Sequence, residues 1–111
     1  MTSLAAKVDA IYLPTDNTVA STASTIGEIL QEAKVPAMGS DAAVIDATLF
    51  TYGVDYHAIG VQAGELAVKI LKGDKPADLP VEKPNTAAVT VNEEMATALG
   101  FDAETIKALE K

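Results

Sequence analysis

The stretch DAIYLPTDNT, residues 9–18, joins a short apolar run to a run of polar side chains. Residues 11–13 favour a buried strand, and Pro14 ends it because proline has no N–H to donate to a strand ladder. Thr15–Thr18 then offers four consecutive side chains that can hydrogen-bond. The pattern predicts a strand that reaches the edge of a sheet, followed by a polar turn that opens a helix.

The rest of the chain repeats this alternation. Helical spacing of apolar residues predicts helices over residues 17–34 and 56–72, the second ended by Gly73. Further strands are expected over 35–39, 48–55 and 87–92. Short helices are expected over 40–47, over 93–99 and from Asp102, the last carrying Ile106 and Leu109. A proline-rich connection is expected over 74–84, and the last turns of a helix over 2–8. This order predicts an α/β fold, with a mainly parallel sheet of about four strands and flanking helices.

Composition restricts the classes of function. The chain has 111 residues, of which 49% are hydrophobic and 22% charged, as in a globular domain. Its net charge of -8 argues against a nucleic-acid or anionic-membrane partner, and solubility explains the acidity most simply. The absence of cysteine excludes disulfides, thiolate nucleophiles and Cys-based metal sites. No signal peptide or membrane span is expected in this chain, so an exported protein would need an export signal beyond it.

Polar residues follow three of the predicted strands. They are Thr15, Asp16 and Asn17 after the first, Ser40 and Asp41 after the second, and Tyr52 and Asp55 in and after the third. The carboxyl ends of parallel strands meet at one edge, where ligands bind, so we expect these residues to gather there. A carboxylate suits a ligand ammonium group, and the N–H groups of a helix start suit a ligand carboxylate. A zwitterionic amino acid would use both.

Helix capping is the alternative explanation for the same residues. Asp16 or Asn17 can accept hydrogen bonds from the start of the helix over 17–34, and Ser40 or Asp41 can do so for the next helix. Each cap is worth about 1 kcal/mol. For any one residue taken alone capping is favoured, and the grouping of three strand ends favours a ligand site.

An enzyme is the least favoured hypothesis. Asp16, Asp41 and Asp55 resemble the acidic Mg²⁺ pocket of receiver-like phospho-acceptor domains, but the first strand lacks an acidic pair and the last strand ends in Asn92 rather than lysine. His57 is the only histidine, which excludes a His-based triad or zinc cluster. The sequence therefore predicts no catalytic residue, metal or cofactor.

Four segments together resemble one known family. They are VDAIYLPTDNTVAS, VPAMGSDAAV, TYGVDYHAIGVQAGELAVKILKGDKPADLPVE and VNEEMATALGF. In order and spacing they are similar to the C-terminal part of ABC importer substrate-binding proteins, in the group that binds tryptophan and other aromatic amino acids. The resemblance implies a type I periplasmic-binding-protein fold, in which two lobes close on a ligand without chemistry. A permease and an ATPase carry out transport, and the proteins are extracellular, cell-surface (often as lipoproteins) or periplasmic.

The resemblance also assigns parts of the chain. It implies a single partial domain, with residues 1–55 like the second lobe, 56–73 a first-lobe helix, 74–86 a crossing segment and 87–111 a C-terminal strand and helices. The ligand contacts it implies are Thr15, Asp16, Asn17, Ser40, Asp41 and Tyr52. Most of one lobe is missing, so we expect weak affinity and an uncovered helix over 56–73, which predicts a homodimer or swapped dimer. The alternative is a truncated or engineered fragment that folds and self-associates without binding a ligand.

Overall fold

The computed structural model describes residues 1–109, which form two compact units. The first consists of Met1–Gly53 together with the chain from Ala88 onward, and the second of Val54–Ala87. Residues 110 and 111 of the predicted C-terminal segment lie outside the described residues. All of the predicted ligand contacts belong to the first unit.

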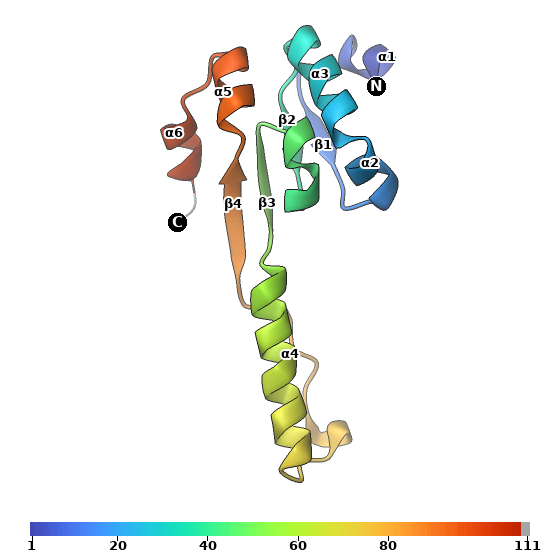
Figure 1. The fold of residues 1–111 in the computed structure, drawn as a ribbon, viewed down its shortest axis with the longest axis vertical. Helices are drawn as coiled ribbons and strands as arrows, with labels where there is room; N and C mark the ends of the chain where they lie inside the picture. Colours follow the sequence, from blue (N-terminus) through green and yellow to red (C-terminus); the bar gives the residue numbers. More distant parts are fainter. Residues whose placement is uncertain (110–111) are drawn as a thin grey trace. The chain divides into compact units, whose positions relative to one another are not determined.

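A four-stranded sheet organises the first unit. Its strands are β1 (Ile11–Leu13), β2 (Ala37–Gly39), β3 (Phe50–Val54) and β4 (Ala87–Val91), in the order β1-β2-β3-β4 (Figure 1). β2 pairs in parallel with both β1 and β3. The Asn92 N–H, just after β4, donates to the carbonyl of Leu49, just before β3, at 3.0 Å. The end of β4 therefore lies beside the start of β3, and the two strands run in opposite directions. The predicted α/β fold with a mostly parallel sheet is confirmed.

The helices match the predicted order, with differences at their ends. They are α1 (Thr2–Ala5), α2 (Asn17–Ser21), α3 (Ala23–Ala33), α4 (Tyr56–Leu71), α5 (Glu93–Leu99) and α6 (Ala103–Lys107), with 3-10 helices η1 (Ala42–Ala47) and η2 (Pro76–Asp78). The prediction that Leu109 belongs to the last helix is wrong, since Leu109 follows α6 and is exposed.

The single helix predicted over residues 17–34 is also wrong, because it breaks at Thr22. Thr22 has φ -117° and ψ 13°, outside the helical range. Its hydroxyl donates to the Thr18 carbonyl at 2.9 Å. A hydroxyl that bonds to nearby carbonyls competes with the regular helix ladder, so the chain turns between α2 and α3.

One face of β1 and β2 packs against α3 and η1. Ile11, Leu13 and Ala37 alternate inward and form one buried cluster with Ile26 and Leu30 of α3 and Val44 of η1. A second buried cluster contains Leu49, Met95, Ala96 and Ile106, and joins the start of β3 to α5 and α6. Inward alternation along each strand fixes which side chains remain on the other face and at the strand ends.

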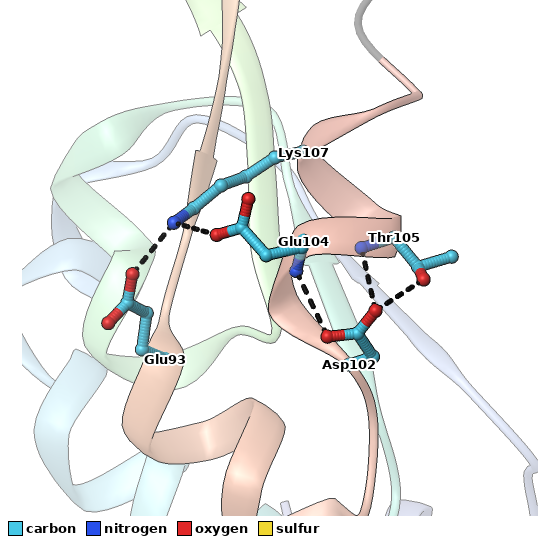
Figure 2. A network of polar contacts seen from close by, with 5 residues as sticks. All are labelled: Glu93, Asp102, Glu104, Thr105 and Lys107. Carbon is cyan, nitrogen blue, oxygen red and sulfur yellow. Dashed lines mark hydrogen bonds and ion pairs between the residues drawn. The ribbon is translucent and has the colours of Figure 1, made fainter.

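An exposed polar network joins α5 to α6 (Figure 2). Lys107 Nζ contacts Glu93 Oε1 at 2.8 Å and Glu104 Oε1 at 2.9 Å. The hydrogen bond from Lys107 and its charge lower the pKa of the Glu93 carboxyl. Asp102 caps α6, and the hydrogen bonds from the Thr105 hydroxyl and backbone lower its pKa. The hydrogen bonds that Lys107 donates to Glu93 and Glu104 raise its pKa above the ordinary value.

We expect Lys107→Ala to move the pKa of Glu93 up toward its ordinary value of 4.5. A lowered carboxyl pKa stabilises the folded state above the unfolded pKa, and this contribution disappears as pH falls through the folded value. Carboxyl ¹³C shifts measured between pH 2 and pH 6, a window of roughly two units on either side of a carboxyl pKa, follow the change. Lys7→Ala, at an exposed lysine after α1, is the control. An unchanged Glu93 titration in Lys107→Ala would contradict the contact.

The second unit consists of α4 and the segment that returns along it. Asp55 caps α4 by accepting hydrogen bonds from the N–H groups of His57 and Ala58, at 2.8 and 3.1 Å. Gln62 Nε2 donates to Glu82 Oε2 at 2.9 Å, and so fastens the return segment. None of the α4 residues is buried. No helix among residues 1–109 has the length and apolar character needed to cross a bilayer.

Candidate functional site

The carboxyl ends of β1, β2 and β3 lie at one edge of the sheet. In the parallel register Leu13 lies opposite Gly39, and Gly39 lies opposite Thr51. The residues that follow each strand therefore leave the sheet on the same side. We call Thr15, Asp16, Asn17, Ser40, Asp41 and Tyr52 the rim.

A direct hydrogen bond joins two of the strand ends. Thr15 Oγ1 and Ser40 Oγ lie 2.9 Å apart, and either can be the donor. The Ser40 N–H also donates to the Leu13 carbonyl at 3.1 Å, which extends the β1–β2 ladder by one bond. The expectation that these polar strand ends come together holds for Thr15 and Ser40.

Asp41 is held in the corner between β2 and η1, which we call the Ser40–Asp41 corner. Its side chain is buried, with 6% exposure, and Oδ1 accepts a hydrogen bond from the Ala43 N–H at 2.8 Å. Of the two capping residues considered, Asp41 and not Ser40 caps this helix. Capping and burial together fix the position of this carboxyl group at the strand end.

Tyr52 and Gly53 bring β3 to the same corner. An ideal Cβ placed on Gly53 would lie 2.7 Å from the Ser40 carbonyl oxygen, so the two backbones approach closely. The neighbouring Tyr52 side chain is 51% exposed and lies on the opposite face of β3 from the buried Thr51. The sequence prediction did not include Gly53, although a glycine within a strand pattern indicates close backbone approach.

Asp16 and Asn17 open α2. Asp16 is the N-cap, and its Oδ1 accepts hydrogen bonds from the N–H groups of Thr18 and Val19 at 2.8 and 3.0 Å. The capping role considered for Asp16 is therefore confirmed, and the N–H groups of Thr18 and Val19 are already bonded. Asn17 is the first residue of α2 and is exposed.

The charge of the rim is negative. It contains the carboxylates of Asp16 and Asp41, two hydroxyl groups, one amide and one phenol, and no lysine or arginine. Such a set can accept hydrogen bonds from an ammonium group and can donate through its hydroxyls to a carboxylate. Asp55, the third acidic residue considered, caps α4 in the second unit.

The polar end of β4 lies elsewhere in the first unit. Asn92 Nδ2 donates to the Ile45 carbonyl at 3.1 Å, and Asn92 lines a hollow of ≈ 290 Å³ with residues of α3, η1 and α5. Asn92 therefore lies beside the start of β3, near Leu49, and is not part of the rim. Among the described residues there is no group of three or more His, Cys, Asp or Glu side chains that could hold a metal ion.

Comparison with known proteins identifies the family. The family described as ABC transporter substrate binding protein matches residues 1–107. The chain belongs to this family. The resemblance to this family stated from the sequence motifs is thereby confirmed. A similar curated protein is the tyrosine-binding protein of Clostridioides difficile (strain R20291). That protein is 34% identical over 100 residues, which are 89% of this chain and 29% of the relative.

Solved structures that resemble this chain also include a substrate binding protein and an ABC domain. The ligand-free, open structure of a substrate binding protein with adhesive properties from Clostridium difficile is 36% identical, with a TM-score of 0.79 over 91% of this chain and 35% of that one. An ABC domain from Streptococcus pneumonia in complex with L-Trp is 37% identical, with a TM-score of 0.74 over 95% of this chain and 37% of that one. This substrate-binding-protein chain thus spans about a third of the length of the solved relatives it matches.

Proposed function

We propose that this chain is the ligand-facing part of a substrate-binding protein that takes an aromatic amino acid, tyrosine or tryptophan, for an ABC importer. The observation that carries the proposal is that the ends of β1 and β2, joined by the Thr15–Ser40 hydrogen bond, lie in parallel register beside β3 at Thr51. The relatives named for tyrosine binding and solved with L-Trp support the choice of ligand class.

The proposed ligand contacts are the six residues of the rim. Asp41 receives the ligand ammonium group, because its carboxylate is fixed by capping at the corner. Thr15 and Ser40 bind the ligand carboxylate, since beyond their mutual bond the second hydroxyl hydrogen has only the long 3.5 Å contact from Ser40 Oγ to the Leu13 carbonyl, which a ligand can replace. Tyr52 lies exposed on β3 and packs against the ligand ring. Asp16 and Asn17 complete the polar border.

The remainder of the transporter follows from the family and belongs to the same proposal. Residues 1–55 act as part of one lobe, α4 as a piece of the other, and residues 74–86 as a crossing segment. The full-length protein works outside the cell membrane, at the cell surface as a lipoprotein or in the periplasm. It delivers its ligand to an ABC permease and carries out no chemistry on it.

Isothermal titration calorimetry with L-tyrosine and L-tryptophan tests this function. Half a cleft encloses a ligand incompletely, so we expect dissociation constants of about 1 mM, equivalent to about -4 kcal/mol. L-Alanine, which has the same ammonium and carboxylate groups and no ring, is the matched control ligand and should bind more weakly. Absence of heat with both aromatic amino acids at 10-fold higher concentration than this estimate would contradict the proposal.

A second candidate, self-association without ligand binding, has one observation in its favour. In α4, the helix expected from the sequence to be uncovered, Val61 and Val68 are 51% and 47% exposed, and Leu71 is 85% exposed. Exposed apolar side chains in a row favour a contact with a second copy, as a homodimer or swapped dimer.

Sedimentation velocity over a range of protein concentrations tests this contact. We expect the chain to dimerise and Val68→Asp to weaken the dimer at least about tenfold, since it would bury an unpaired charge. Thr25→Asp, on the exposed side of α3, should leave association unchanged. A single monomer boundary at every concentration would exclude the dimer.

A further inference from the structure

Gly53 lies against the backbone of the Ser40–Asp41 corner. An ideal Cβ on Gly53 would lie 2.7 Å from the Ser40 carbonyl oxygen and 3.3 Å from the Asp41 Cα. Both neighbours are backbone atoms, so rotation of a side chain cannot relieve the contact. The φ angle of Gly53 is not in the left-handed region that favours glycine. Glycine is therefore required here for space and not for backbone conformation.

The corner is fixed on the sides away from Gly53. The Ser40 N–H is bonded to the Leu13 carbonyl of β1 at 3.1 Å. Asp41 accepts from the Ala43 N–H at 2.8 Å, and its carbonyl accepts from the Val44 N–H at 3.2 Å. A side chain on Gly53 must therefore strain these bonds or push the end of β3 away.

We propose that Gly53 is a positioning residue for the ligand site, setting the spacing between Tyr52 on β3 and the Ser40–Asp41 corner. The proposal rests on the proposed function for its effect on affinity. Whichever backbone gives way to a side chain at Gly53, Tyr52 and Asp41 change their relative positions. An aromatic ring and an ammonium group on one ligand could then no longer meet both residues in their original geometry.

Gly39 provides a contrast on the neighbouring strand. An ideal Cβ there would lie 2.5 Å from Val44 Cγ2 and 3.0 Å from Thr51 Cγ2, both of which are side-chain atoms of buried residues. A substitution at Gly39 thus disturbs the core, whereas one at Gly53 disturbs the backbone of the rim. Gly60, on α4, has no heavy atom within 4 Å of its ideal Cβ apart from its own helix backbone and chain neighbours, and is the control.

The experiment compares Gly53→Ala, Gly39→Ala and Gly60→Ala in the 111-residue chain by amide NMR, thermal unfolding and titration with L-tryptophan and L-tyrosine. We expect Gly53→Ala to shift the ligand-free amide signals of Ser40, Asp41 and Tyr52. We also expect it to weaken binding at least about tenfold, while the folded fraction remains high. Gly39→Ala should instead lower the unfolding midpoint. Gly60→Ala should leave the affinity unchanged and should not lower the midpoint, since alanine favours a helix over glycine.

Two results would overturn the positioning role. One is a Gly53→Ala protein whose Ser40 and Asp41 amide signals are unchanged. The other is a Gly53→Ala protein that unfolds more easily yet keeps the wild-type affinity in its folded fraction, which would make Gly53 merely structural. If the wild type binds neither amino acid, the proposed function fails, and the ligand-free amide shifts alone decide the positioning role.

A measurement on the wild type covers the case in which Gly53→Ala does not fold. The hypothetical Cβ occupies the direction of one Gly53 Hα proton, so this proton must lie close to the corner. We expect nuclear Overhauser effects between the Gly53 Hα protons and Asp41 Hα. Their absence in the folded wild type would overturn the proposal without any variant.

Discussion

Gly27→Ala is expected to destabilise the first unit by about 3 kcal/mol, although alanine normally favours a helix over glycine by about 1 kcal/mol. Gly27 is buried in the middle of α3, where the helix lies directly against η1. An ideal Cβ there would lie 2.1 Å from the Asp46 carbonyl oxygen and 3.1 Å from the Asp46 carbonyl carbon. A methyl group must force the two backbones apart and open the core between α3 and the sheet.

Urea unfolding monitored by circular dichroism measures this loss. Glu28→Ala, at the exposed next position of α3, is the matched control and should stay within about 0.5 kcal/mol of wild type. Gly64→Ala is the control for the change from glycine to alanine in a helix, because its ideal Cβ meets no heavy atom within 4 Å apart from its own helix backbone and chain neighbours. A stability of Gly27→Ala equal to or above that of wild type would show that α3 does not approach η1 as described.

Asp41→Asn is expected to weaken the binding of L-tyrosine and L-tryptophan by about 10- to 100-fold, which corresponds to the loss of one charge-assisted hydrogen bond. Asparagine and aspartate cap helices about equally well. The substitution can therefore keep the bond from the Ala43 N–H while it removes the negative charge. Asp41→Ala removes both, so a comparison of the two variants separates the cap from the charge.

Calorimetry and thermal unfolding together check this prediction. Asp102→Asn makes the same chemical change at the cap of α6 and should leave affinity unaltered. Because binding to the wild type is weak, the expected result for Asp41→Asn is heat below detection with an unfolding midpoint close to that of the wild type. Wild-type affinity in Asp41→Asn would mean that this carboxylate does not receive the ligand ammonium group.

The positions of the strand ends could be predicted from the sequence, because they depend on neighbouring residues. Pro14 and the polar residues after it mark where β1 stops, and a parallel sheet then dictates that neighbouring strand ends meet. The caps at Asp16 and Asp41 were likewise expected, since capping depends on residues two or three positions apart.

Features that depend on contacts between distant parts of the chain could not be predicted from the sequence. The direction of β4 is set by its pairing with β3, and the apolar pattern of a strand is the same in either direction. Gly27 interrupts a helical pattern and looks unfavourable there until η1 is seen against it. Gly53 likewise gains its meaning only from the Ser40 carbonyl, which belongs to a segment earlier in the chain.

The most direct test of the binding rim is a two-dimensional amide NMR titration of the 111-residue chain with L-tryptophan. The prediction is that shifts concentrate at Thr15, Asp16, Asn17, Ser40, Asp41 and Tyr52 and saturate together. No shift at these residues at millimolar ligand, or shifts that concentrate instead around Asp46 and Asn92, would contradict it.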